Sequence, residues 1–430
     1  MRDETQPTTQ KIPVNAEKPR VLLLLPTRTY RATDFLDAAL KLNVEVVIAS
    51  EEPATTADLS PKDTLVLDFR DPTTATEIIT EFANTKPIAA IVGVDDDTTI
   101  LATTASEALG LPHNPISSAK ATRDKYLLRK TLAKQGVPVP TYKRISVHDD
   151  ITEISKQIDF PCVIKPLSLS ASRGVIRANN PIQFNQAFER ITKLLHSVKE
   201  SRETDSNNQR LQHLIVEDYI PGIEVALEGI LLNGELKTLA LFDKPDPLEG
   251  PFFEETLYIT PSRLSIEIQE ELHAATVQAS AALGLQHGPV HAELRYNVNG
   301  AHLIEIAART IGGLCSRTLR FGTGMSLEEL VIRQAIGQPI DTFSREKQAA
   351  GVMMIPVPKT GILGNVRGTK QARNINGIEE VNITIPIGGV VIPLPEGDKY
   401  LGFIFARADT PKVVESALRE AHKLMEFVIL

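Results

Sequence analysis

The sequence predicts an α/β and α+β protein that begins with a doubly wound parallel sheet and ends with a small α+β domain. Over residues 19–115, apolar runs of strand length alternate with segments of helical spacing, which is typical of a parallel sheet covered by helices on both faces. Residues 346–430 instead contain short strand-like runs separated by Gly and Pro. A chain of 430 residues is long enough for these two domains and a central one.

The predicted N-terminal domain, residues 19–115, contains four strand-like runs. They read RVLLLLP, VEVVIAS, TLVLDF and IAAIVGV, and ATDFLDAALKLN after the first run has helical spacing. The loop after the first strand, TRTYRA, lacks the G-x-G-x-x-G glycines, so a dinucleotide site of the usual kind is not expected. Residues 1–18 are polar without an apolar signal core, and we expect a flexible tail.

The predicted central domain covers residues 116–345, with a lid subdomain at about 140–218. A helix in TRDKYLLRKTLAKQG, opened by Lys125 and stopped at Gly136, precedes the rigid linker VPVP. The polar stretch HSVKESRETDSNNQRLQ is expected to be a mobile loop. Strands are predicted in CVIKP, HLIVEDYI and IEVALEGILLNGELKTLALF, helices around 182–195, at 265–283 and in SLEELVIRQAIG, and a hairpin at 291–310.

The predicted C-terminal domain covers residues 346–430. Its strands are expected in GVMMIPVPKTGILGNVRG, EEVNITIPIGGVVIPL and YLGFIFARA, and a helix at 411–425 closes it.

Composition excludes several classes of function. With 46 basic and 54 acidic residues the formal net charge is −8, a poor match for nucleic acid or an anionic membrane. No apolar run approaches the roughly 20 residues that span a bilayer, and a cytoplasmic protein is expected. Cys162 and Cys315 form no CxxC motif, so each is expected to be a buried thiol.

The stretch HAELRYNVNGAHLIEIAART carries Glu293 and Glu305 on two predicted strands. A two-residue turn of Asn299 and Gly300 would pair Glu293 with Ile306 and put Glu305 on the opposite face. A three-residue loop that begins at Val298 would pair Glu293 directly with Glu305, with Cβ atoms about 5 Å apart. Both registers are open at this stage.

Directly opposed carboxylates repel each other, and a divalent cation would compensate them. Oxygen ligands from two strands suit Mg²⁺, which keeps its other positions for water and phosphate, and Mn²⁺ accepts the same ligands. The same face would carry His291, Arg295, Ala307 and Arg309. The alternative is an ordinary hairpin with one exposed glutamate on each face.

Three further segments suggest nucleotide binding, each with a simpler alternative. Lys165 follows an apolar strand beside the small-residue loop LSLSASRG, which can form a phosphate cradle or a surface turn. Lys125 at a helix start is more often simply solvated. In VEDYIPGIEV, Glu217 and Glu224 flank a turn that can offer backbone groups to a base and a carboxylate to ribose hydroxyls, or can be an ordinary strand end.

In this order, the segments resemble the ATP-grasp superfamily of ATP-dependent carboxylate–amine ligases over about residues 20–430. The chain is most similar to the L-amino acid ligase (dipeptide synthetase) branch, and its layout is similar to that of biotin carboxylase. The resemblance implies the ATP-grasp fold and an ADP-forming enzyme that uses ATP and Mg²⁺. Its expected reaction is amide-bond formation through an acyl phosphate.

The resemblance also implies roles for individual residues. ATP binding is expected of Lys125, Lys165, Ser168, Ser172, Arg173, Gly174, Glu217, Asp218, Ile220 and Glu224. The lysines would contact phosphates, the loop from Ser168 to Gly174 would fold over them, Glu217 and the backbone after it would contact adenine, and Glu224 would bind ribose. Glu293 and Glu305 would ligate one or two Mg²⁺, and Arg309 would be the catalytic residue that stabilises the transferring phosphoryl group.

Two features depart from the family pattern. Most members have Asn two residues after the second glutamate as a further metal ligand, and this chain has Ala307. Three explanations are open: water fills the ligand position, a second Mg²⁺ is bound more weakly, or another side chain such as His291 replaces the missing ligand. The loop after Lys165 is also poor in glycine.

The expected partners are a small-molecule carboxylate and an amine, with amino acids as the favoured pair, and a homodimer is compatible with the superfamily. Candidate substrate contacts are Tyr30, Glu255, Tyr258, His287 and His291. Three rival functions remain: a ligase for a carboxylate other than an amino acid in natural-product synthesis, a biotin-type carboxylase, and an ATP-binding protein without catalysis.

Overall fold

The structure is a computed structural model that describes residues 18–52, 64–200 and 209–430, and it begins with a parallel sheet. The strand order is β3-β2-β1-β4 and every pair is parallel, which confirms the predicted fold class for this region. The strands are β1 (Arg20–Leu24), β2 (Glu45–Ser50), β3 (Thr64–Val66) and β4 (Ala90–Gly93). Apart from Lys18, the predicted tail lies outside the described residues.

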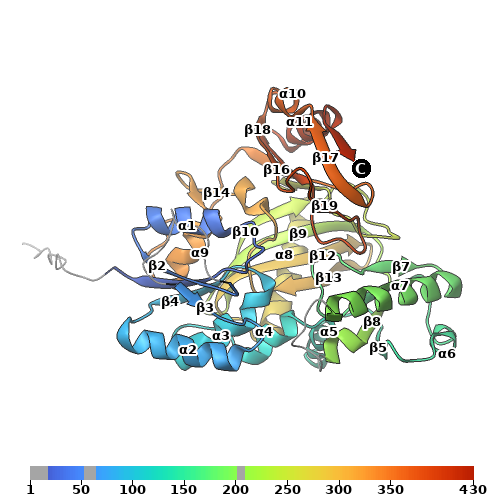
Figure 1. The fold of residues 1–430 in the computed structure, drawn as a ribbon, viewed down its shortest axis with the longest axis horizontal. Helices are drawn as coiled ribbons and strands as arrows, with labels where there is room; N and C mark the ends of the chain where they lie inside the picture. Colours follow the sequence, from blue (N-terminus) through green and yellow to red (C-terminus); the bar gives the residue numbers. More distant parts are fainter. Residues whose placement is uncertain (1–17, 53–63, 201–208) are drawn as a thin grey trace, which may run out of the picture.

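Helices cover both faces of this sheet (Figure 1). Val21 and Leu23 of β1 pack with Phe35 of α1 (Ala32–Lys41), whereas Leu22 and Leu24 pack on the opposite face. That face is covered by α2 (Pro72–Thr85) and α3 (Thr99–Ala108). Successive strand residues point to opposite faces, so the unbroken apolar run of β1 requires a cover on each side.

The central sheet has the order β13-β12-β9-β10-β11-β16-β20-β18. Its strands are β9 (Ile223–Leu232), β10 (Glu235–Asp243), β11 (Leu257–Thr260), β12 (Gly288–Asn297), β13 (Gly300–Ala307), β16 (Ala349–Ile355), β18 (Ile378–Ile383) and β20 (Gly402–Ala408). The strands pair antiparallel throughout. This one sheet runs across the domain boundary expected between residues 345 and 346, and the boundaries themselves stay predictions.

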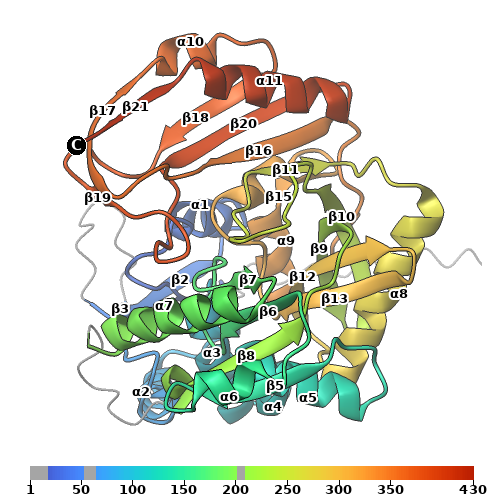
Figure 2. The ribbon, with the colours of Figure 1, turned by 90° about the vertical axis from the view of Figure 1, so that its right-hand side faces the viewer.

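Two helices cover the two ends of this sheet (Figures 1 and 2). In α8 (Ile266–Leu283), Leu272 and Ala279 are buried in one cluster with Leu294 of β12. In α11 (Pro411–Lys423), Val414 and Leu418 are buried with the apolar residues of β16 and β20. The hairpin that carries the two predicted metal ligands is therefore fixed to a packed core.

The lid region is a four-stranded sheet of order β5-β8-β6-β7 covered by a long helix. Its elements are β5 (Tyr142–Ser146), α6 (Ile151–Ser155), β6 (Cys162–Pro166), β7 (Ile176–Ala178), α7 (Pro181–Glu200), the 3₁₀ helix η2 (Gln209–Gln212) and β8 (His213–Asp218). The expected loop over residues 196–212 is wrong at both ends, because α7 continues to Glu200 and η2 begins at Gln209. The apolar stripe of α7 continues through Leu195 to Val198, which explains the longer helix; residues 201–208 lie outside the described residues.

The remaining elements connect these sheets. They are the 3₁₀ helices η1 (Asp96–Thr98) and η3 (Cys315–Thr318), the helices α4 (Ile116–Thr122), α5 (Lys125–Lys134), α9 (Leu327–Ala335) and α10 (Thr369–Arg373), and the strands β14 (Arg320–Phe321), β15 (Met325–Ser326), β17 (Gly361–Arg367), β19 (Val390–Val391) and β21 (Glu426–Ile429). Lys125 opens α5 as predicted, because the Asp124 carboxylate accepts hydrogen bonds from the N–H groups of Tyr126 and Leu127.

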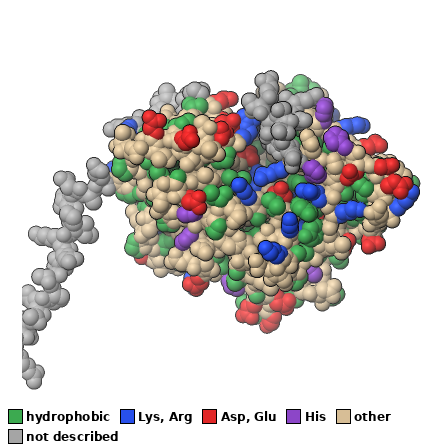
Figure 3. Space-filling view, turned by 90° about the horizontal axis from the view of Figure 1, so that it is seen from below, with side chains coloured by type: hydrophobic (Ala, Val, Ile, Leu, Met, Phe, Trp, Pro, Cys, Tyr) green, Lys and Arg blue, Asp and Glu red, His purple; other side chains and the backbone are tan. Residues whose placement is uncertain are grey.

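Three properties predicted from the sequence can be compared with the structure: the state of the cysteines, the length and polarity of the helices, and the distribution of charge. Cys162 and Cys315 are free and buried, as predicted. Within the described ranges, every helix is too short or too polar to cross a membrane. Although the formal net charge is −8, Lys and Arg side chains gather in the middle of the face shown in Figure 3.

Candidate active site

A cleft lies between the lid sheet and the hairpin of β12 and β13. Its walls come from β6, β8 and the loop 169–172 on one side and from β9, β12 and β13 on the other. The predicted residues that line it are Lys125, Lys165, Ser172, Glu217, Asp218, Ile220, Glu224, Glu255, His291, Glu293, Glu305 and Arg309. The fold thus gathers most of the predicted site, and the roles of these residues stay predictions.

The hairpin turn differs from both turns that the sequence suggested. Asn297 pairs with Gly300, so the turn consists of Val298 and Asn299. The Asn297 side-chain oxygen accepts a hydrogen bond from the backbone N–H of Asn299 at 2.8 Å. This side-chain contact closes the turn one residue earlier than the Asn-Gly pattern indicated.

The pairing of Glu293 with Glu305 depends on a β-bulge. The ladder shifts by one residue beside Glu293, which makes Ile304 the extra residue of β13. Arg129 Nη2 donates a hydrogen bond of 2.7 Å to the Ile304 carbonyl and so satisfies a backbone group at the bulge. The predicted pairing of the two glutamates is confirmed, although both predicted turns were wrong.

On the lid side of the cleft, the carboxylate of Glu217 contacts two basic side chains. Arg129 donates to it at 2.8 and 3.2 Å, and Lys165 Nζ lies 2.6 Å from its Oε2. Burial would raise the pKa of Glu217, but the charges of Arg129 and Lys165 outweigh it and hold the pKa at about 2. The carboxylate expected beside adenine therefore positions Lys165. Arg129 was missed, although it lies four residues after Lys125 and thus on a neighbouring position of the same helix face.

Lys125 connects the loop after β6 to the hairpin. Its backbone N–H donates to the Leu167 carbonyl at 3.0 Å, and its Nζ donates to the Leu169 carbonyl at 2.9 Å. The same Nζ lies 3.4 Å from Glu305 Oε1. One ammonium group therefore contacts both the predicted phosphate loop and a predicted metal ligand.

Glu293 belongs to a cluster with Glu224 and Glu255, whose ligand oxygens lie within 4.8 Å of one another. Lys244 lies among them: its Nζ is 2.9 Å from Glu224 Oε1, contacts Glu255, and is 3.7 Å from Glu293 Oε2. Burial would raise the pKa of Glu293, but the charge of Lys244 contributes most to keeping it well below its usual range. Lys244 was missed because it becomes distinctive only when the three carboxylates surround it.

The carboxylate of Glu224, expected to bind ribose, also accepts a hydrogen bond from Arg295 Nε at 2.8 Å. Arg295 Nη1 donates to the Ile220 carbonyl at 2.7 Å, and its guanidinium lies over the rings of Tyr219 and Phe253. Arg295 therefore fixes the turn that was predicted to face the base.

His291 lies on β12 directly opposite Ala307, and a buried carboxylate contacts its ring. Nδ1 is 3.1 Å from Glu228 Oε2, and Nε2 is 3.7 Å from Glu293 Oε1. Glu228 is 0% exposed and also accepts a hydrogen bond from the Ile311 N–H at 3.1 Å. Burial would lower the pKa of His291, but its hydrogen bond to Glu228 and its contact with the Glu293 carboxylate outweigh burial and raise the pKa.

The loop over the cleft adopts a strained backbone. Ala171 and Ser172 have φ angles of +57° and +54°, a region that costs free energy for residues other than glycine. Arg173 Nε donates to the Glu396 carbonyl at 2.7 Å, so this side chain contacts the C-terminal domain rather than the cleft expected for it. Ala171 and Ser172, rather than Arg173, therefore lie in the wall of the cleft.

Several predicted residues lie outside the cleft lining: Ser168, Arg173, Gly174, Tyr30, Tyr258 and His287. Tyr258, a predicted substrate contact, belongs to β11, and its hydroxyl donates to Glu255 at 2.8 Å. Tyr30 packs edge-on against Phe403. His287 lines a second cavity beside His113.

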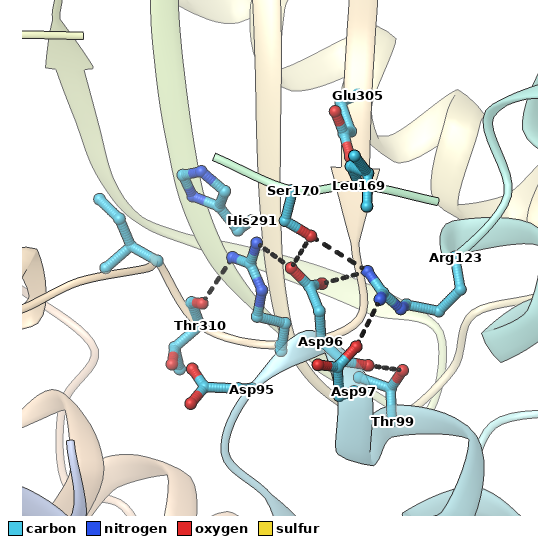
Figure 4. Close-up of polar contacts among 12 residues, drawn as sticks. Asp95, Asp96, Asp97, Thr99, Arg123, Leu169, Ser170, His291, Glu305 and Thr310 are labelled. Carbon is cyan, nitrogen blue, oxygen red and sulfur yellow. Dashed lines mark hydrogen bonds and ion pairs between the residues drawn. The ribbon is translucent and has the colours of Figure 1, made fainter. Parts of the chain in front are cut away.

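Asp96 of η1 contacts both Arg309 and Ser170 of the loop, and Figure 4 shows Asp96 beside Ser170 and Arg123. Arg309 Nη2 and Ser170 Oγ each donate to Asp96 Oδ2 at 2.9 Å, and Arg123 Nη1 lies 3.3 Å from Oδ1. Burial would raise the pKa of Asp96, but the charges of Arg309 and Arg123 hold it well below its usual range. The N-terminal domain therefore orients the arginine predicted to be catalytic.

The donor set fits a nucleotide and a divalent cation. Glu293 and Glu305, on adjacent strands, offer the oxygen ligands that Mg²⁺ requires. Lys125 and Lys165 offer positive charge for phosphates. An apolar wall for a base is formed by Val163, Val175, Tyr219, Phe253 and Ile304. Anionic and apolar parts of one ligand would thus meet matching groups.

Three family models match successive parts of the chain. The ATP-grasp N-terminal domain matches residues 36–113, the ATP-grasp domain residues 158–318, and the L-amino acid ligase C-terminal domain 2 residues 353–429. The crystal structure of L-amino acid ligase from Bacillus licheniformis aligns with a TM-score of 0.79 at 22% identity, and covers 97% of this chain and 100% of that one. This likeness confirms the fold.

Three relatives show how far sequence similarity reaches. Alanine–anticapsin ligase of Bacillus subtilis (strain 168) is 28% identical over an aligned region that covers 53% of this chain and 50% of that protein. Dapdiamide A synthase of Enterobacter agglomerans is 26% identical over 77% of this chain and 78% of its own. The uncharacterized protein y4rH of Sinorhizobium fredii (strain NBRC 101917 / NGR234) is 22% identical over 98% of this chain and 85% of its own.

Proposed function

Since this chain belongs to the ATP-grasp ligases, in the ADP-forming L-amino acid ligase branch, we propose that it joins two amino acids through an amide bond with the use of ATP. The observation that carries the proposal is the convergence of two facing carboxylates, two lysines and Arg309 on one cleft. The relative named alanine–anticapsin ligase supports amino acids as the substrate class.

The proposed chemistry starts from the poor reactivity of a carboxylate, whose leaving group would be oxide. Transfer of the γ-phosphoryl group of ATP to a carboxylate oxygen gives an acyl phosphate and ADP. Attack by the amine then forms the C–N bond, breaks the C–O bond to phosphate and releases the amine proton to solvent. A divalent cation bound by Glu293 and Glu305 would neutralise phosphate charge.

The side chains of the cleft would position the reactants. Lys125 and Lys165 would bind phosphate oxygens, and Arg309, which also lines the cleft, would stabilise the transferring phosphoryl group. The loop through Ala171 and Ser172 would exclude water, which otherwise hydrolyses an acyl phosphate. The protein would thus position the two reactants and neutralise the charge of the phosphates.

The proposal is tested by measuring ADP release across pairs of amino acids, with mass spectrometry of the products. We expect ADP only when both an acid and an amine are present, and a product whose mass is their sum less one water. Turnover that requires bicarbonate and biotin would identify a biotin-type carboxylase instead. ATP binding without ADP formation across the whole panel would contradict a catalytic role.

Replacing Asp96 by asparagine is expected to lower the turnover number by about 10- to 100-fold while leaving ATP affinity nearly unchanged. The neutral amide attracts the Arg309 guanidinium less and lets it drift, whereas the two lysines keep their positions. Turnover assays and calorimetric titration with a non-hydrolysable ATP analogue measure the two effects. The matched control is Asp97→Asn next to it, whose carboxylate is 64% exposed; equal turnover in both variants would refute a positioning role for Asp96.

A further inference from the structure

Ala307 leaves a gap in the donor set of the proposed cation site, because its methyl group offers no ligand atom. The residue paired with it across the hairpin is His291. Both side chains line the cleft, and Figure 4 shows His291 in the same close-up as Glu305. The side chain next to the gap is therefore an imidazole.

The Glu228 carboxylate determines which ring nitrogen of His291 can act as a ligand. At 3.1 Å from Nδ1 it can only accept, so the hydrogen lies on Nδ1 and the lone pair of a neutral ring lies on Nε2. Glu228 is fully buried and is anchored by the Ile311 N–H. A carboxylate on the far side of an imidazole is the arrangement that orients metal-binding histidines.

The other ring nitrogen faces the proposed metal ligand Glu293. Nε2 lies 3.7 Å from Glu293 Oε1. Two ligand atoms at right angles, each about 2.1 Å from one cation, are about 3 Å apart, so a small rotation of the glutamate side chain brings both into reach. A cation bound at Nε2 would take the place of the proton that otherwise lies between this nitrogen and the Glu293 carboxylate.

We propose that His291, oriented by Glu228, is a ligand of the divalent cation bound by Glu293, in place of the side chain missing at Ala307. The proposal rests on the proposed function, because that function supplies the cation. An imidazole ligand favours Mn²⁺ over Mg²⁺ more strongly than an all-oxygen site does. We therefore expect the chain to bind Mn²⁺ with clearly higher affinity than Mg²⁺.

The experiment uses the full chain with Mn²⁺ and a non-hydrolysable ATP analogue. Free Mn²⁺ is titrated by electron paramagnetic resonance, and pulsed measurements detect the coupling between bound Mn²⁺ and a ligand nitrogen. We expect a directly bound imidazole nitrogen in the unmodified protein and its loss in His291→Ala. The matched control, His302→Ala, removes a histidine of the same hairpin that does not line the cleft and should retain the coupling.

Glu228→Gln tests the positioning residue. The glutamine oxygen can still accept from the Ile311 N–H, so its amide group would then donate to Nδ1 and move the ring hydrogen to Nε2. We expect the nitrogen coupling to vanish and Mn²⁺ affinity to fall about 10- to 100-fold, while circular dichroism shows a folded protein. A folded Glu228→Gln variant that keeps both the nitrogen coupling and the Mn²⁺ affinity would overturn the role of Glu228.

The outcomes separate this inference from the function beneath it. If the protein binds Mn²⁺ and loses it in Glu293→Gln but shows no nitrogen coupling, the inference fails and the proposed function stands. If Glu293→Gln and Glu305→Gln bind Mn²⁺ as the unmodified protein does, the cation site of the proposed function fails as well.

Discussion

Replacing Glu305 by glutamine is expected to abolish nearly all Mg²⁺-dependent ADP formation, a loss of at least about 100-fold. Glutamine keeps the size of the side chain but removes the charge that would bind the proposed divalent cation between β13 and β12. Folding should be affected little, because the carboxylate is 34% exposed and its ion pair with Lys125 is long at 3.4 Å. ADP release as a function of Mg²⁺ concentration measures the loss.

The matched control is Glu271→Gln on α8, whose exposed carboxylate accepts a hydrogen bond from the Tyr296 hydroxyl away from the cleft. It makes the same chemical change without touching the proposed site and should retain turnover. Thermal unfolding of both variants shows whether the fold is intact. Near wild-type turnover in folded Glu305→Gln would rule out this residue as a metal ligand.

Replacing Lys165 by methionine is expected to weaken ATP binding by about 10- to 100-fold, the size of one lost hydrogen bond to a charged group. The structure adds a second effect, because Lys165 is buried and its Nζ lies 2.6 Å from Glu217. Glu217 keeps Arg129, so we expect the free energy of unfolding to fall by only about 1–3 kcal/mol. Calorimetric titration with an ATP analogue and chemical denaturation measure the two effects.

Lys143→Met is the control, since Lys143 belongs to the same lid sheet but its Nζ donates to Gln157 on the exposed side. This variant should change neither the ATP affinity nor the free energy of unfolding appreciably. A Lys165→Met protein that is destabilised but binds the nucleotide with unchanged affinity would show that this lysine only supports the lid.

Apolar patterning was sufficient to predict most of the fold. The run RVLLLLP is apolar on both strand faces, and β1 is indeed buried on both sides by helices. Patterning was less informative for short or irregular segments: β11 was not among the predicted strands, and the end of α7 was expected to be an irregular loop. A polar surface face conceals an apolar stripe when only one residue in three or four is apolar.

For the site, residue type, order along the chain and the resemblance to the ATP-grasp ligases singled out Lys125, Lys165, Glu293, Glu305 and Arg309, and the fold brings them to one cleft. What the sequence determined by itself is which chemical groups are present and which strands and helices carry them. These follow from local patterns of period two or 3.6 and from the order of the segments.

Only the tertiary structure decided how those groups are paired. The two glutamates face each other because a β-bulge shifts the ladder, and Arg129, on a helix far away in sequence, donates a hydrogen bond to the carbonyl at this bulge. Arg309 meets Asp96 of the N-terminal domain, and Lys244 meets three carboxylates from three different segments. Charge interactions depend on distance and burial, and chain folding sets both between residues that no local pattern connects.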